Sequence, residues 1–205
     1  MYTLIGYPRT RTFRAMWMME EAGLDYHLNP APPRSEPVTV HNDLGKVPVL
    51  IAEGQALTDS TAILTYLADR HGVLTFPAGS LERARQDGLT HFALDEFDAR
   101  IWTAARHTFV LPEEMRLPAI KDSLKWEVAT SAKMLAARIG HGPFLMGDTM
   151  TIADIVTGHC LSWAKVAKFD IGNRVLDDYL DRLQARPAYQ AAMAKGQAAL
   201  SSDAG

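Results

Sequence analysis

Three short segments carry polar side chains whose types and spacing could do chemistry, and the first lies near the start of the chain. Tyr7, Thr10 and Thr12 place hydroxyl groups in a turn that precedes a predicted helix. The free backbone N–H groups and the dipole at a helix N-terminus stabilise an anion. A thiol held there would lose its proton more readily, because its thiolate gains hydrogen bonds and a favourable field. The structural alternative is that Thr10 or Thr12 only caps the helix.

The second segment is Thr58-Asp59-Ser60-Thr61, directly before another predicted helix. A helix N-terminus holds a carboxylate, and an adjacent aspartate holds an ammonium group. Asp59 and Ser60 together therefore match the head group of an α-amino acid. The structural alternative is that these side-chain oxygens only cap the helix that follows, which needs a single residue.

The third segment is Gly45-Lys46-Val47-Pro48-Val49-Leu50. Because proline has no N–H to donate, Pro48 belongs at a strand start, on an edge strand or in a cis turn. A cis Pro48 would leave the backbone groups of Val47 free to pair with an extended peptide ligand, as an added strand does. The alternative is an ordinary trans proline at the start of a strand, and the segment alone does not exclude it.

The segments are joined by elements that form a compact α/β unit. Apolar residues at helical spacing run from Phe13 to Ala22, and a helix this apolar must be covered on most sides. Alternating apolar residues on both sides of Glu53-Gly54 are typical of a hairpin. In order, the patterns predict a strand over 2–5, a helix over 13–22, a strand over 24–28, a Pro-rich loop, a hairpin over 47–57 and a helix over 62–71.

Beyond residue 80 the strand patterns stop. The sequence predicts helices over about 81–110, 118–139, 151–168 and 173–196, separated by Pro or Gly. Strand-type segments followed by helix-type segments indicate an α+β fold with two domains. We expect an α/β domain over 1–77, a linker and helix start over 78–84, and an all-helical domain over 85–205. Thr151 and Asp154 have capping-box spacing, which is a structural device.

Composition excludes several classes of protein. The 205-residue chain has a formal net charge of −3 and 47% apolar residues, which is typical of a globular protein with a core. Its dispersed basic residues predict no nucleic-acid partner, and no apolar run reaches the roughly 18 residues that a membrane span needs. The single cysteine, Cys160, excludes an internal disulfide and a multi-cysteine zinc site. The start lacks a secretory signal, so we expect a cytoplasmic location.

In this order the segments resemble the cytosolic glutathione transferase family, in particular its bacterial, theta- and beta-like members. The matching segments are 7–24, 42–50, 57–63, 144–148, 151–154 and 186–189, spread over nearly the whole chain. The resemblance implies a thioredoxin-like N-terminal domain followed by an all-α helical C-terminal domain. It also implies that the protein is a homodimer, as members of the family usually are.

The resemblance further implies a glutathione site, assigned by motif position. Val47, before a cis Pro48, would pair through its backbone with the cysteinyl part of glutathione. Asp59 and Ser60 would bind the γ-glutamyl ammonium and carboxylate groups. Lys46 would approach the glycine carboxylate.

The catalytic hydroxyl has two candidates. Thr10 stands where bacterial members carry a serine, and Tyr7 stands at the end of the first strand, where other classes carry a tyrosine. We favour Thr10, because a short hydroxyl at the helix start donates to the thiolate while the helix amides add to the field. The turn contains no cysteine, which argues against a mixed-disulfide mechanism.

The predicted function is therefore that of a glutathione transferase active in detoxification. It would bind glutathione as co-substrate, need no metal, and conjugate the thiolate to a small hydrophobic electrophile. Trp102 and Trp163 are candidates for the hydrophobic-substrate site, although each could also be a core aromatic residue. Peroxide reduction, dehalogenation and double-bond isomerisation are further chemistries of the family. The alternative function is that of a non-catalytic or weakly catalytic binding protein with the same fold.

Overall fold

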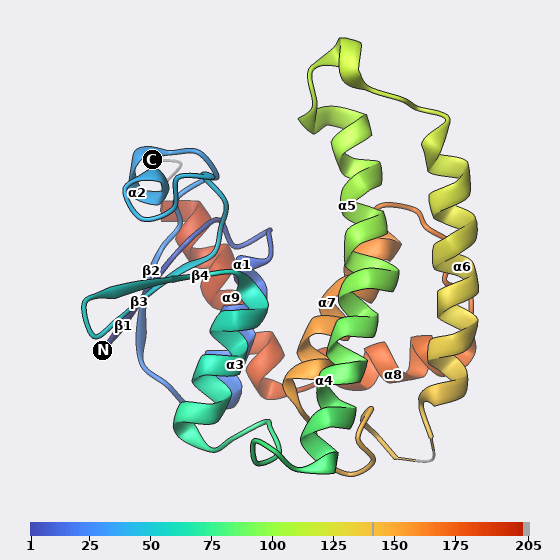
Figure 1. Cartoon of the computed structure of the whole chain (residues 1–205). Coiled ribbons are helices and arrows are strands. Elements are labelled where there is room, and N and C mark those ends of the chain that lie inside the picture. Colours follow the sequence, from blue (N-terminus) through green and yellow to red (C-terminus); the bar gives the residue numbers. More distant parts are fainter. Residues whose placement is uncertain (141, 203–205) are drawn as a thin grey trace. The chain divides into compact units, whose positions relative to one another are not determined.

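A computed structural model describes residues 1–140 and 142–202 of the chain. Contacts between Cα atoms divide it into two compact units, one formed by residues 1–78 together with the chain from 184 onward, the other by residues 79–183 (Figure 1). The domain boundaries expected from the sequence, at 77 and 85, describe order along the chain and stay a prediction. The last helix joins the first unit in space although it is last in sequence.

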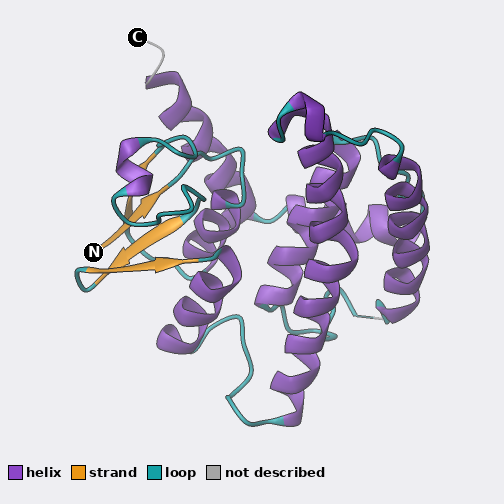
Figure 2. Ribbon diagram, turned by 45° about the horizontal axis from the view of Figure 1, so that its top comes forward, coloured by secondary structure: helices purple, strands orange, loops and turns teal. Residues whose placement is uncertain are grey.

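The first unit is built around a four-stranded sheet with strand order β2-β1-β3-β4 (Figure 2). Its strands are β1 (Tyr2–Ile5), β2 (Tyr26–Asn29), β3 (Val49–Ala52) and β4 (Gln55–Thr58). β1 pairs parallel with β2 and antiparallel with β3, so that Leu4 faces both Leu28 and Leu50. The predicted hairpin is confirmed as the antiparallel pair β3–β4. The helices of this unit are α1 (Thr12–Glu21), α2 (Glu36–Thr39), α3 (Ser60–His71) and α9 (Pro187–Ser202).

Helix α1 lies at the centre of the first unit and is covered on most sides, as its sequence predicts. Residues 15–19 of α1 have no exposed surface, and both α3 and α9 pack against it. Tyr189 on α9 makes edge-to-face contacts with Phe13 and Trp17, with ring centroids 5.1 and 5.0 Å apart. This burial fixes the position of the turn that leads into α1.

The second unit is helical. It contains α4 (Leu81–Ala93), α5 (Ala99–Ala105), α6 (Ile120–Arg138), α7 (Ile152–Val166) and α8 (Arg174–Gln184). The helix predicted over 81–110 is continuous, but Leu94–Asp98 and Arg106–Val110 are π-helical. Along the described residues, no helix combines the length and the apolar character that crossing a membrane requires.

Three expectations from the sequence are corrected by the structure. The segment 173–196 is not one helix, because α8 ends at Gln184 and α9 begins at Pro187. A proline cannot donate the hydrogen bond that would continue a helix, but it is suited to a helix start. The Pro-rich loop contains the short helix α2, with Pro37 in its first turn. The N–H groups of a first turn have no partner within the helix, so a proline there costs no hydrogen bond. Strand β2 also begins at Tyr26 rather than at residue 24.

Candidate functional site

The turn between β1 and α1 holds both candidate catalytic hydroxyls. Thr10 is half-buried, and its Oγ1 donates to the Tyr7 carbonyl at 2.6 Å. The same oxygen lies 3.0 Å from Thr12 Oγ1 and accepts from the Thr12 N–H at 3.2 Å. The hydroxyl of Thr10 therefore supports the turn that leads into α1, although the N-cap residue of the helix is Arg11 and no side chain caps it.

This role does not tie the Thr10 hydrogen to one acceptor. The Tyr7 carbonyl also accepts from the backbone N–H of Thr10 at 3.1 Å. If the hydroxyl rotated toward a bound thiolate, the carbonyl would keep that backbone bond and would not be left unsatisfied. Tyr7 itself is half-buried and lies at the start of the same turn.

Gly6 brings this turn close to the Val47 segment. Its φ is 152°, and a Cβ atom placed on it would lie 2.3 Å from Thr12 Oγ1 and 3.0 Å from Val47 Cβ. Any side chain at position 6 would push these residues apart. The glycine is thus required where two of the predicted site segments meet.

Val47 presents an unpaired stretch of backbone beside that turn. The Val47–Pro48 peptide bond is cis, as the resemblance implies, and β3 begins only at Val49. Within the described part of the chain, neither the N–H nor the C=O of Val47 has a hydrogen-bond partner. Such groups are what an extended peptide uses when it adds to a sheet edge.

The loop before Val47 is shaped by Asn42, to which the sequence analysis gave no role. Its Nδ2 donates to the Lys46 carbonyl at 2.9 Å, and its Oδ1 accepts from the Leu44 N–H at 3.2 Å. Gly45, at φ 62°, closes the turn by donating its N–H to the Asn42 carbonyl. The Lys46 side chain is exposed. An asparagine three residues before a glycine is a turn signal that could have identified this residue.

Asp59 and Ser60 lie at the N-terminus of α3. Asp59 has a φ of 69°, and its Oδ1 accepts from the N–H groups of Thr61 and Ala62 at 2.9 and 3.0 Å. The capping role is therefore confirmed for this aspartate. Ser60 begins the helix and is only 3% exposed.

Arg14 lies beneath Ser60 and is not among the site residues predicted from the sequence. This residue of α1 is completely buried, and its Nη1 donates to Ser60 Oγ at 3.3 Å. Arginine is rarely buried completely unless it is paired. The available signal was an arginine inside a helix predicted to be covered on most sides.

Trp102 and Trp163 come together in the second unit. Trp102 lies on α5 and Trp163 on α7, and their ring centroids are 6.5 Å apart at an interplanar angle of 47°. His159, one turn earlier on α7, lies 6.3 Å from Trp163. All three side chains are half-buried, so the two tryptophans are not sealed inside the core.

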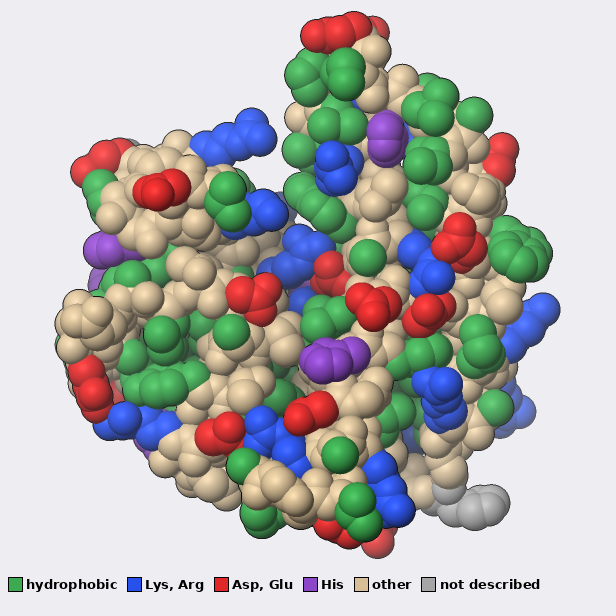
Figure 3. Space-filling view, viewed as in Figure 1, with side chains coloured by type: hydrophobic (Ala, Val, Ile, Leu, Met, Phe, Trp, Pro, Cys, Tyr) green, Lys and Arg blue, Asp and Glu red, His purple; other side chains and the backbone are tan. Residues whose placement is uncertain are grey.

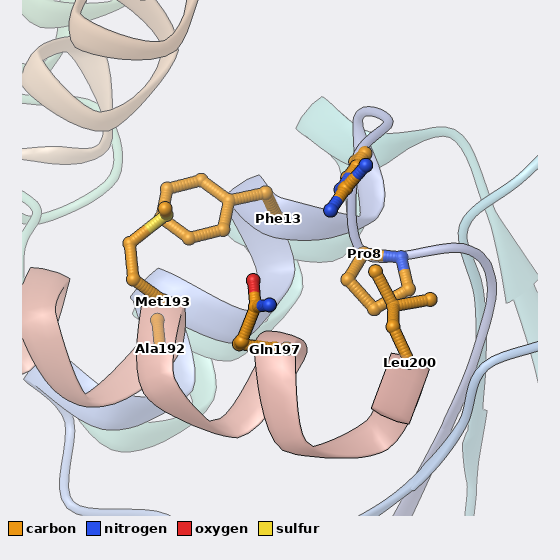
Figure 4. Close-up of a pocket in the computed structure, with 8 residues that line it drawn as sticks. Pro8, Phe13, Ala192, Met193, Gln197 and Leu200 are labelled. Atoms are coloured by element: carbon orange, nitrogen blue, oxygen red, sulfur yellow. The ribbon is translucent and has the colours of Figure 1, made fainter. Parts of the chain in front are cut away.

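A small cavity of about 50 Å³ lies between the first turn and α9. In Figure 4, Phe13 and Met193 lie toward one end, Pro8 and Leu200 toward the other, and Gln197 between them. The cavity is lined by Pro8, Arg9, Phe13, Ala192, Met193, Gly196, Gln197 and Leu200. Ligand pockets usually measure about 300 Å³ or more, so this cavity is too small to receive a whole substrate.

On the face shown in Figure 3, basic and acidic side chains are interspersed over each unit. Among the described residues there is no group of three or more His, Cys, Asp or Glu side chains that could hold a metal ion.

Comparison with known proteins shows similarity to glutathione transferases. The model of the glutathione S-transferase N-terminal domain matches residues 10–70. Glutathione S-transferase GST-4.5 of Xanthomonas campestris pv. campestris is 28% identical over 155 residues, which are 74% of this chain and 76% of that protein. A solved glutathione transferase from Methylococcus capsulatus, also 28% identical, superposes with a TM-score of 0.81 over 96% of this chain and 99% of that one.

In sequence and in fold the chain is similar to glutathione transferases, and the comparisons support its membership of that family. Its fold is the thioredoxin-like unit and helical region expected from the resemblance. Elongation factor 1-gamma of Trypanosoma cruzi is also similar, being 31% identical over 121 residues. That match covers 58% of this chain but only 28% of the elongation factor.

Proposed function

We propose that this protein binds glutathione, stabilises its thiolate and transfers the sulfur to a small hydrophobic electrophile. The observation that carries the proposal is the unpaired backbone of Val47 beside the turn that begins α1. An extended tripeptide that pairs with Val47 would bring its central residue, cysteine, next to that turn. The thiol would then lie where backbone N–H groups point outward.

The two ends of the tripeptide have assigned partners in the proposal. The γ-glutamyl carboxylate would bind Ser60 and the N-terminal amides of α3, and the ammonium would bind the carboxylate of Asp59. Capping uses Oδ1 of Asp59, and Oδ2 is the oxygen assigned to the ammonium. The exposed Lys46 would approach the glycine carboxylate.

The chemical step is a nucleophilic substitution or addition. The thiolate attacks carbon, a C–S bond forms, and the leaving group departs with its electron pair. With an activated double bond, the sulfur adds to one carbon and a proton is taken up at the other. Thr10 contributes by donating its hydroxyl hydrogen to the thiolate, which lowers the pKa of the thiol, and Tyr7 is the competing donor.

The second substrate would be apolar. Trp102 and Trp163 form the half-buried aromatic pair that we assign to it. Apolar walls select size more than chemical identity. A panel of aryl halides, organic hydroperoxides, haloalkanes and isomerisable enones would therefore distinguish conjugation from the other chemistries of the family.

The test of the proposal measures the bound thiol directly. Wild type should be retained on immobilised glutathione, and ultraviolet absorbance should show a thiol pKa at least about one unit below its ordinary value of about 8.5. Thr10→Ala should return the pKa toward that value, whereas Tyr7→Phe should not. Thr39→Ala is the matched control, because among the described residues the hydroxyl of Thr39 bonds only carbonyls in and before α2. Failure to retain the wild type would contradict the proposal.

The second candidate function is glutathione binding with little catalysis. It is favoured by the existing bond from the Thr10 hydroxyl to the Tyr7 carbonyl. Retention of the wild type with an unshifted thiol pKa would support this alternative.

We also propose a cytoplasmic homodimer that acts in detoxification. Light scattering at micromolar concentration checks the oligomeric state, and a monomer would contradict it.

A further inference from the structure

Arg14 has a position that the proposed function does not yet explain. It lies on α1, is completely buried, and reaches the first residue of α3 through the 3.3 Å contact between Nη1 and Ser60 Oγ. Burying a guanidinium group is costly unless its hydrogen bonds are satisfied. A neutral side chain of similar size would fill the same space without that cost.

The contact fixes the direction of the Ser60 hydroxyl. A guanidinium group can only donate, whereas a serine hydroxyl has one donor hydrogen and two acceptor sites. Arg14 occupies an acceptor site, so the Ser60 hydrogen is directed to another group. Asp59 holds the backbone of the same turn through its bonds to Thr61 and Ala62. The Ser60 hydroxyl therefore accepts from Arg14 and keeps its own hydrogen to donate, while Asp59 holds the turn that carries it.

The charge of Arg14 acts in the same direction. It lies within reach of the N-terminus of α3, where the helix dipole is already positive. A buried cation is screened much less than an exposed one, and Nη1 of Arg14 lies 3.3 Å from Ser60 Oγ. Both effects favour a carboxylate at this point and give no advantage to a neutral group.

We infer that Arg14 is a positioning residue for the α-carboxylate of the γ-glutamyl group, acting through Ser60. The inference rests on the proposed function, because it assigns a role within the same glutathione site. It predicts a specific selectivity: the protein should discriminate glutathione from an analogue that lacks only this carboxylate, and Arg14 should be responsible for much of the difference.

Titration calorimetry with two ligands tests the inference. The ligands are glutathione and 4-aminobutyryl-cysteinyl-glycine, in which a hydrogen atom replaces the α-carboxylate. Wild type should bind glutathione about 10- to 100-fold more tightly, the range typical of hydrogen bonds to a charged group. Arg14→Met should reduce this ratio about tenfold, mainly by weakening glutathione, with less than a twofold change for the analogue.

Four further variants separate positioning from general loss of structure. Ser60→Ala should lower the ratio similarly, and the double variant Arg14→Met/Ser60→Ala should lower it no further. Arg14→Lys keeps the charge and should restore part of the ratio. Arg186→Met is the matched control, since Arg186 also binds α1, through Glu21, and it should leave the ratio unchanged.

The outcomes are distinguishable. If Arg14→Met weakens both ligands equally, or leaves the ratio at the wild-type value, Arg14 has only a structural role and the inference is wrong. If Arg14→Met does not fold, Arg14→Lys and Ser60→Ala still test the inference, and an unchanged affinity ratio in both variants overturns the inference. If wild type binds neither ligand, the proposed function itself fails. Binding by wild type without discrimination overturns this inference alone.

Discussion

The turn before α1 and the Val47 segment, two parts of the proposed site, lie close together only because Gly6 has no side chain. A methyl group there would meet Thr12 Oγ1 at 2.3 Å and Val47 Cβ at 3.0 Å, and the φ of 152° disfavours any side chain. We expect Gly6→Ala to lower the free energy of unfolding by about 2–4 kcal/mol, from backbone strain and overpacking together. Urea denaturation measures the loss, and retention on immobilised glutathione should fall with it.

The chain offers a control for the strain component of the Gly6 substitution. Gly54 also has a positive φ, 76°, but a Cβ there would meet nothing within 4 Å. Gly54→Ala should therefore cost only about 1–2 kcal/mol of strain. Thr12→Ala, combined with Gly6→Ala, should recover part of the loss because it removes the closest atom. Equal losses in Gly6→Ala and Gly54→Ala would contradict the role given to Gly6.

At the scale of the element, Asp154 holds the start of α7. Its Oδ1 accepts from the Leu145 N–H and from the Tyr179 hydroxyl, both at 2.8 Å, and its Oδ2 accepts from the Thr151 N–H at 2.8 Å. The capping box predicted from the sequence is confirmed. An asparagine replaces one acceptor oxygen with a donor, so Asp154→Asn should lower the free energy of unfolding by about 2–4 kcal/mol. Tyr179→Phe, which removes one bond, should cost about 1 kcal/mol.

The same carboxylate predicts a pH dependence. Burial raises the pKa of Asp154, against the opposing effect of its hydrogen bonds. The folded protein therefore holds the carboxyl proton of Asp154 more tightly than the unfolded chain does, in which aspartate has its ordinary pKa of about 3.9. The stability that binding of this proton adds is fully present below the unfolded pKa, and it is lost as the pH rises through the folded pKa. The difference in unfolding free energy between wild type and Asp154→Asn should therefore become smaller as the pH rises from the unfolded to the folded pKa. A constant difference would contradict the raised pKa of Asp154.

How far the sequence predicts the elements depends on whether their cause is local. The periodicity of 13–22 and the alternation around Glu53-Gly54 predicted α1 and the hairpin, because one face of each must be buried. The π-helical segment Leu94–Asp98 was not predicted, since one extra residue in a helical turn leaves no mark on composition. The break before Pro187 could have been predicted from the lost N–H alone.

For the candidate site, too, the features with a local cause were predicted from the sequence and those that depend on packing were not. The types and spacing of Thr10, Asp59 and Ser60 indicated an anion site at two helix starts, and the family resemblance was needed to favour a cis Pro48. The contact between Arg14 and Ser60 joins residues 46 positions apart. No pattern within a single sequence encodes such a pair, because it exists only once α1 and α3 have packed together.

At the scale of the whole molecule, the first unit is formed by both ends of the chain, since α9 packs on α1. Arg186, just before α9, makes a two-point ion pair with Glu21 of α1, at 2.6 and 2.7 Å. The Glu21 side chain is 6% exposed and that of Arg186 is 33% exposed. Removing the cation would leave a buried carboxylate without this partner, which is expensive, although exposure of the arginine moderates the cost.

We therefore expect Arg186→Met to lower the free energy of unfolding by about 1–3 kcal/mol. Because the ion pair joins the last helix to the first, the amides of α9 and of the C-terminal half of α1 should exchange hydrogen faster in this variant than in wild type. Arg174→Met is the control, since Arg174 is 93% exposed and lies 3.8 Å from its partner Asp178. That substitution should change stability by no more than about 0.5 kcal/mol. Faster exchange confined to α9, with α1 unchanged, would show that the last helix is not needed to hold the helix that begins the proposed site.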